Sequence, residues 1–181
     1  SDLSVPYPLF ALSGLVIWGF FSTGLSNSAN SMVNNSNIIK KVYFPRLIIP
    51  FSAILSSSVD FVISLVLFFV ITFYYGISIS WVHVLFLPVA LLMISASTLG
   101  IGMFLAALNI KYRDVRYILP FFIQGMLFVS PVMFPVSITN NPIATTVLKF
   151  NPVAGALELI RSIFLDYQMD LTTILYSSIS T

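Results

Sequence analysis

Side chains able to do chemistry gather in one short part of the sequence, residues 109–120. This stretch holds Lys111, Arg113 and Arg116 with a single acid, Asp114, between two long apolar runs. A second basic stretch, residues 37–46, holds three more cations, so the two stretches contain six of the eight Lys and Arg residues of the chain. The chemistry that such clusters offer is electrostatic contact, for example with anionic lipid headgroups.

Signatures of catalysis are missing from the sequence. It has no Gly-rich phosphate loop ending in Lys, no strong nucleophile beside a histidine and no metal-spaced cluster of His, Asp and Glu. It also has no cysteine, which excludes disulfides and thiolate metal sites. We therefore expect no enzyme activity, cofactor or metal site in this chain. If the function of the chain requires ATP, another polypeptide must bind the nucleotide.

The composition is that of a membrane protein. Hydrophobic residues make up 58% of the 181 residues and charged residues 8%, whereas a soluble domain carries roughly a quarter charged residues. An all-α fold is expected, because helices satisfy their own backbone hydrogen bonds in lipid. Four stretches reach the roughly 20 residues that a crossing needs: 8–31, 48–75, 83–108 and 117–135. A further, incomplete span begins at 171, and residues 1–181 form a single transmembrane domain.

The two basic stretches predict the orientation of the chain. Two predicted spans separate them, so they lie on one side of the membrane, which the positive-inside rule makes cytoplasmic. Residues 143–165 are too polar for a simple crossing and too apolar for a free loop. They divide at Asn151-Pro152 into two short amphipathic pieces, which predicts a re-entrant helical pair at the outer surface. Glu158 and Arg161 then share one helical face.

Polar residues also lie inside the predicted spans. Asp60 is the only ionisable residue deep in a span, and a charge there costs about 2.5 to 3.5 kcal/mol on insertion scales, so it must face the bundle interior or water. It is either part of a hydrated path or a structural hydrogen-bonding partner. Residues 22–31 are nearly all small or amide side chains. They either pack tightly against a helix or form a hydroxyl-recognising wall, with Ser22, Ser26 and Asn30 as candidate path residues.

Aromatic and small residues add two patterns. Aromatic residues make up 15% of the chain, and most of them are expected to face lipid or the membrane interface. An aromatic face also suits the C–H face of a sugar ring, and Trp18 and Phe21 are the preferred candidates because they precede the polar stretch. In the third span, Thr98, Gly102 and Ala106 recur at every fourth residue and predict a contact ridge between helices.

Longer motifs then point to a family. They are residues 8–15 (PLFALSGL), 40–46 (KKVYFPR), 109–117 (NIKYRDVRY), 128–135 (FVSPVMFP), Pro120-Phe121 and Asn151-Pro152. Together they resemble the membrane subunits of type-2 ABC exporters for O-antigen, teichoic acid and capsular polysaccharide. The resemblance covers nearly the whole chain and says little about the substrate. Members of that family have six spans, so the four predicted here would be the second to the fifth, and both ends of the chain would be cut.

The resemblance implies a channel-forming subunit that moves a lipid-linked polysaccharide from the cytoplasm across the bacterial inner membrane. It implies a homodimer joined to two P-loop ATPases, which bind ATP and Mg²⁺, and no nucleic acid among the partners. In such exporters the two cytoplasmic loops are short helices seated in clefts of the ATPases. The residues carried over as coupling elements are Asn37, Lys40, Lys41, Phe44, Pro45, Arg46, Lys111, Tyr112, Arg113, Asp114 and Arg116. Those carried over as the outer gate are Asn151, Pro152, Glu158 and Arg161.

Other functions stay open from the sequence. A type-2 ABC exporter of another amphipathic cargo, such as a drug or a lipo-oligosaccharide, fits the same motifs. A proton-coupled carrier or a passive channel draws limited support from Asp60, although such a carrier usually has more than one intramembrane acid. A membrane-embedded glycosyltransferase is disfavoured, because Asp114 stands alone where an acidic pair would be needed to hold a metal and a sugar nucleotide.

Overall fold

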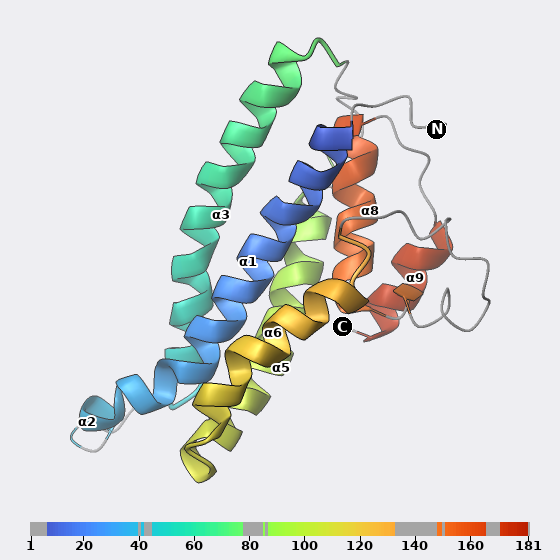
Figure 1. Cartoon of the computed structure of the whole chain (residues 1–181). Coiled ribbons are helices and arrows are strands. Elements are labelled where there is room, and N and C mark those ends of the chain that lie inside the picture. Colours follow the sequence, from blue (N-terminus) through green and yellow to red (C-terminus); the bar gives the residue numbers. More distant parts are fainter. Residues whose placement is uncertain are drawn as a thin grey trace.

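The computed structural model describes residues 7–39, 41, 45–77, 85, 87–132, 148–149, 151–165 and 171–180. The regular elements within these residues are helices (Figure 1). They are α1 (Tyr7–Asn34), α2 (Ser36–Ile39), α3 (Ile48–Tyr74), α5 (Leu87–Lys111), α6 (Val115–Val129), α8 (Pro152–Leu165) and α9 (Leu171–Ser180). The all-helical prediction is confirmed for the described part of the chain.

Three helices are long and apolar enough to cross a membrane. They cover residues 8–34, 48–74 and 87–111 and coincide with the first three predicted spans. The predicted fourth span is shorter where it is described, because α6 has 15 residues, or about 22 Å at 1.5 Å per residue. It ends where Ser130 turns to an extended conformation before Pro131. Residues 133–140 lie outside the described part, so the count of four spans stays a prediction.

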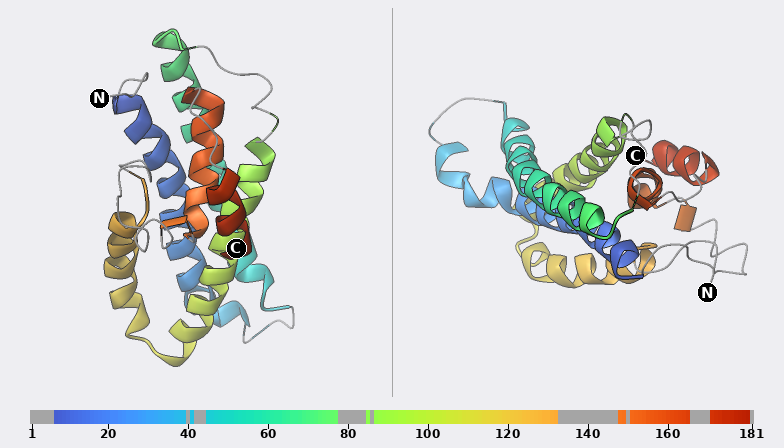
Figure 2. Two further views of the ribbon diagram at one scale, coloured as in Figure 1. Left: turned by 90° about the vertical axis from the view of Figure 1, so that its right-hand side faces the viewer. Right: turned by 90° about the horizontal axis from the view of Figure 1, so that it is seen from above.

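α1 is the central helix of the described structure. It packs against α3, α5, α6 and α8 and against the short α2. Figure 2 shows α3 and α6 on opposite sides of α1 when the chain is seen from above. Phe10, Ile17, Phe21 and Leu25 of α1 are each at most 1% exposed, and they join buried side chains of α3, α5 and α8 in one apolar core. Every other long helix is therefore positioned by its contact with α1.

Small residues bring α1 and α5 close together. A Cβ atom at Gly102 of α5 would lie 2.6 Å from Oγ of Ser28, and one at Gly24 of α1 would lie 3.0 Å from Cγ2 of Thr98. Thr98 and Ala106 are fully buried. The predicted contact ridge on α5 is confirmed, and its partner is the small-residue side of the 22–31 stretch.

The second half of the predicted re-entrant pair, residues 153–165, lies in α8. This helix packs against α5, α9 and α1, and even Glu158 and Arg161 are 4% and 1% exposed. The re-entrant arrangement itself stays a prediction. The first half, residues 143–150, lies mostly outside the described residues. α9, at the predicted start of a last span, covers the side of α8 that faces away from α1 (Figure 1).

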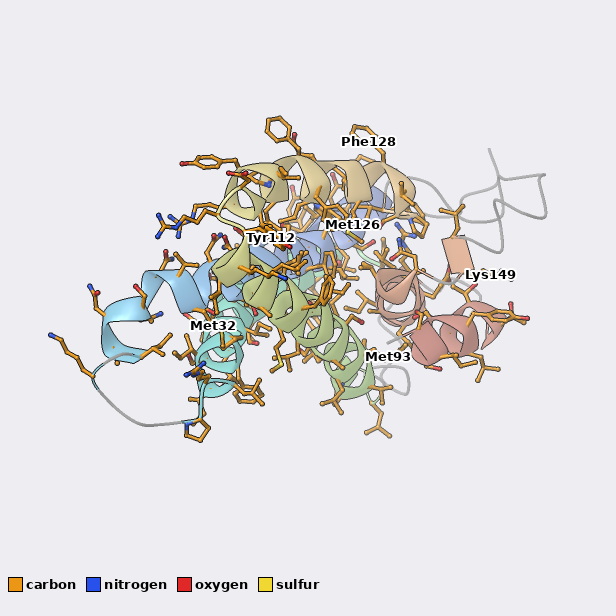
Figure 3. The ribbon with its side chains drawn as sticks, turned by 90° about the horizontal axis from the view of Figure 1, so that it is seen from below. Met32, Met93, Tyr112, Met126, Phe128 and Lys149 are labelled. Carbon is orange, nitrogen blue, oxygen red and sulfur yellow. The ribbon has the colours of Figure 1, made fainter. Side chains whose placement is uncertain are left out.

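The outer side of α3 is apolar and exposed. Val59, Val62, Val66 and Phe73 are 52% to 80% exposed, and only 22% of the most apolar window of this helix is buried inside the chain. On α6, Phe128 is 76% exposed and points away from the other helices (Figure 3). Apolar side chains in such numbers suit contact with lipid or with another membrane-spanning chain.

Candidate functional site

The two predicted coupling stretches meet at one end of the molecule. Both α2 and the turn between α5 and α6 lie at the lower end in Figure 1, which Figure 3 views end-on. Arg46, from the first stretch, and Arg113, from the second, line the same cavity of about 330 Å³ together with Ser36 and Asn109. The two stretches therefore lie at the same end of the molecule, as their predicted location on one side of the membrane requires.

The structure places the coupling residues on short helical ends and turns. Asn37 lies on α2, Lys111 in the last turn of α5 and Arg116 in the first turn of α6. Most of the others lie exposed in the connections: Lys41, Pro45, Arg46, Tyr112, Arg113 and Asp114. The ammonium group of Lys111 is 5.2 Å from the centre of the Tyr112 ring, a cation–π contact that orders the turn. Lys40 and Phe44 lie outside the described residues.

Side-chain hydrogen bonds tie this end to α1. The buried amide of Asn109 donates to the carbonyl oxygen of Ala29 and to Oδ1 of Asn30, both at 3.1 Å. Nη2 of Arg116 donates to Oδ1 of Asn34 at 3.1 Å. The turn between α5 and α6 is therefore bonded to α1 from both of its sides, so a displacement of the turn acts on α1 directly.

A polar groove begins beside Arg116 and runs between α1 and α3. Its volume is about 480 Å³, and its lining residues are Ser26, Asn27, Asn30, Ser31, Asn34, Asn35, Ala53, Ser56 and Arg116. The α1 residues of this set recur every three or four positions, which places them on one side of the helix. We call this feature the polar groove.

Hydrogen bonds hold several side chains of the polar groove in place. The amide of Asn27 donates to Oγ of Ser57 on α3 at 3.1 Å, and that of Asn30 donates to the carbonyl oxygen of Ser26 at 2.9 Å. The two alternatives for residues 22–31 thus apply to different sides of α1. Gly24 and Ser28 pack against α5, whereas the amides line the groove.

Several groove residues were missed by the sequence reasoning. Asn34 and Ser56 line the groove, but neither was chosen as a candidate. The spacing of Asn27, Asn30 and Asn34, three and four residues apart on one helix, was a signal that could have found the first. Ser56 is one serine among several in α3, and only the packing of α3 on α1 distinguishes it.

Asp60 lies beyond the polar groove along α3. It is exposed and lines a cavity of about 270 Å³ with Thr23, Ser57 and Ser64. The hydroxyl of Ser64 donates a hydrogen bond to the backbone carbonyl oxygen of Asp60, four residues earlier in α3, at 2.9 Å. This bond does not involve the carboxylate of Asp60. Both interpretations of Asp60, the hydrated path and the structural partner, stay predictions.

The structure does not place Trp18 and Phe21 on an open face. Their exposed fractions are 8% and 0%, and the two rings pack together with centroids 5.4 Å apart inside the core. Ser22 and Ser26 are half-buried on the open side of α1. The aromatic wall expected from these two rings is therefore not supported, because they fill the interior of the bundle.

Two of the predicted gate residues, Asn151 and Pro152, form the start of α8. Oδ1 of Asn151 accepts a hydrogen bond from the backbone N–H of Val153 at 3.0 Å, so Asn151 caps the helix and Pro152 occupies its first position. The amide of Asn151 also donates to Oγ of Ser130 at 2.8 Å. The Asn-Pro pair thus begins α8 and ties it to the end of α6.

Arg161 makes a second link between α8 and the end of α6. Its Nη1 and Nη2 donate to the carbonyl oxygens of Pro131 and Val132 at 3.0 and 2.6 Å. Its guanidinium also stacks on the ring of Phe10 in α1, 3.8 Å from the centroid. Asn151 and Arg161 are therefore part of a buried junction of α1, α6 and α8, which we call the three-helix junction.

A family model for the ABC-2 type transporter matches residues 3–165. The chain belongs to this family. The O-antigen export system permease protein RfbA of Myxococcus xanthus is 30% identical over 164 residues, covering 90% of this chain and 63% of that protein. The protein of the same name from Klebsiella pneumoniae is 27% identical over 162 residues, covering 88% and 61%. The chain spans about three fifths of the length of these curated relatives.

The family match confirms the resemblance drawn from the motifs. The ABC-2 chain is a permease subunit and a multi-pass membrane protein, as its long apolar helices also indicate. Both coupling stretches, the polar groove and the three-helix junction lie within the matched residues, 3–165. In the described part of the ABC-2 chain, no group of three or more His, Cys, Asp or Glu residues is placed to hold a metal ion.

Proposed function

We propose that the chain is the membrane-spanning subunit of an ATP-driven exporter, and that its cargo is a lipid-linked polysaccharide of the O-antigen kind. The observation that carries this proposal is the joint cavity of Arg46 and Arg113, at the end where the resemblance to type-2 ABC exporters implies contact with an ATPase. The names of the related permeases support the choice of cargo.

The proposal includes the partners. Two copies of the chain form the channel in the inner membrane of a bacterium, surrounded by membrane lipids, and two P-loop ATPase subunits bind ATP and Mg²⁺. Closure of the ATPases moves the segments 37–46 and 111–116. The hydrogen bonds of Asn109 and Arg116 to α1 pass this movement to the helix that contacts most of the others.

Reversal of one coupling charge tests the proposal. Arg113 is exposed in the α5–α6 turn, so Arg113→Glu is expected to leave insertion and ATP hydrolysis intact and to reduce export to background. The measurement is polysaccharide at the cell surface together with ATPase activity of the purified complex. Lys149→Glu, the same charge change away from both turns, serves as the control. Normal export by Arg113→Glu would show that the turn does not couple the two subunits.

A second candidate is a type-2 ABC exporter of another amphipathic cargo. The burial of Trp18 and Phe21 favours it, because it removes the aromatic surface that had pointed to a saccharide. The two candidates are distinguished by transport in proteoliposomes that contain the permease and its ATPase. Uptake of a lipid-linked saccharide supports the first candidate, and uptake of a lipophilic drug with none of the saccharide supports the second.

A further inference from the structure

The polar groove reaches a depth at which lipid hydrocarbon would leave its amide and hydroxyl groups without hydrogen-bond partners. Asn27 is seven residues before the end of α1, and Ser56 is eight residues after the start of α3, so the groove extends about 10 to 12 Å into the spanning helices. Asn27, Asn34 and Ser56 are exposed. Amides and hydroxyls facing lipid chains lose their hydrogen bonds to water at a free-energy cost. In the membrane the groove must therefore be covered by water, a polar ligand or another protein chain.

The lining of the polar groove selects the chemistry of that ligand. All of its lining residues except Ala53 are polar, one is a cation and none is an acid. Amides and hydroxyls both donate and accept hydrogen bonds, which matches the hydroxyl groups of a sugar. A guanidinium matches the geometry of a phosphate. The volume of about 480 Å³ falls within the range of small-molecule sites.

Arg116 is positioned for such a contact. Its bond to Asn34 holds the guanidinium at the mouth of the groove. A guanidinium has five N–H groups, so this bond leaves donors for a second acceptor. Asn27 and Asn30 are likewise held by their bonds to Ser57 and Ser26. Side chains held in this way lose little freedom when a ligand binds, which favours affinity.

We propose that the polar groove binds the phosphate-bearing head of a lipid-linked saccharide, with Arg116 on the phosphate and Asn27 and Asn34 on sugar hydroxyls. This inference rests on the proposed function, since the ligand is the proposed cargo. It changes the assignment of Arg116 from ATPase contact to ligand contact. Arg116 and Arg113 also line a neighbouring cavity of about 270 Å³, so the ligand lies next to the coupling turn.

The experiment uses the permease with its ATPase in phosphatidylcholine nanodiscs. The probe is a polyprenyl diphosphate disaccharide that carries a photoactivatable diazirine on its second sugar. Labelling is expected within residues 26–35 and 53–56, located by mass spectrometry. Ser56→Phe fills the groove and is expected to abolish this labelling. Ser52→Phe is the matched control, because Ser52 is exposed one turn earlier on α3 and does not line the groove.

Arg116 variants test the phosphate contact. Arg116→Gln removes the charge and is expected to weaken probe binding about tenfold or more, the usual effect of losing a charged hydrogen bond. Arg116→Lys is expected to recover part of this loss, because the charge stays while the planar fork is lost. Equal binding by the original chain and Arg116→Gln would overturn the phosphate contact.

Competition distinguishes the sources of phosphate. Reduced labelling with a free disaccharide phosphate supports the inference. Competition by phosphatidylglycerol or inorganic phosphate, with none by the disaccharide phosphate, overturns the saccharide assignment. Labelling that Ser56→Phe leaves unchanged, or cross-links from groove positions to a second copy of the chain, overturns the site. If export is normal in that case, the proposed function stands. Absence of polysaccharide export from the unaltered complex contradicts the proposed function itself.

Discussion

Arg161 shows how one buried side chain holds an irregular segment in place. The carbonyl groups of Pro131 and Val132 follow the end of α6, and the guanidinium of Arg161 donates a hydrogen bond to each of them. Gly14 of α1 approaches the same carbonyl of Val132 so closely that a Cβ atom would collide with it. The position of the segment after α6 is therefore set by α1 and α8 together.

Replacement of Arg161 is expected to destabilise the chain. Arg161→Met keeps the length of the side chain and removes both charged hydrogen bonds, so the free energy of unfolding should fall by about 3 kcal/mol. Arg161→Lys should lose less, because an ammonium group can reach one of the carbonyls. Unfolding in mixed detergent and dodecyl sulfate micelles measures the change. The exposed Arg113→Met is the control, and a similar loss there would show that the effect is not specific to the junction.

The residues of the polar groove could have been separated from the core by periodicity. Phe21 and Asn30 are nine residues apart, as are Trp18 and Asn27, and nine residues are about two and a half helical turns. Each aromatic residue therefore lies on the side of α1 opposite to a groove amide. The partners of Asn109 and Arg161 could not be inferred in this way, because they are backbone carbonyls brought close by the tertiary packing.

At the scale of elements, the contact between α1 and α5 depends on the glycine at position 102, which has no side chain to separate the two helices. Gly102→Val would place a branched side chain against Ser28, and such overpacking is expected to cost about 1 to 3 kcal/mol. Gly100→Val is the matched control, since no atom lies within 4 Å of a Cβ atom there and the helix propensity of the change is the same. Unfolding of both variants in detergent tests this. Equal stability would contradict close packing at Gly102.

The long helices were predictable and the short ones were less so. Three spans were placed within about four residues of their observed ends, because an apolar run of about 20 residues is typical of a membrane-spanning helix and of few other structures. α8 was predicted as one amphipathic half of a re-entrant pair at the outer side of the membrane, and its burial among other helices was not predicted. Its burial depends on neighbours that receive the side chains of Glu158 and Arg161, including the carbonyl groups after α6. No local pattern identifies such neighbours.

At the scale of the whole molecule, the two coupling stretches form one surface. Because the chain has no cysteine, the pair Arg46→Cys and Arg113→Cys can be introduced without background. A short bismaleimide is expected to join them in most molecules and to block export while ATP hydrolysis continues. The cross-link is measured on a gel after the chain has been cleaved between residues 46 and 113, because only cross-linked chains keep their two fragments together. The pair Arg46→Cys and Lys149→Cys should stay unjoined, and an equal yield for both pairs would contradict the shared cavity.

The central position of α1 has a consequence for the width of the polar groove. α3 and α6 border α1 on opposite sides, and in the described residues they share no substantial interface. α6, which carries Arg116, can therefore move on α1 without breaking an extensive contact with α3, so the mouth of the groove can widen while its lining on α1 and α3 stays in place. Cargo heads that differ in bulk could then bind to one set of hydrogen-bonding groups. Tolerance towards different cargoes would follow from the way the helices pack, with no dedicated pocket for each head.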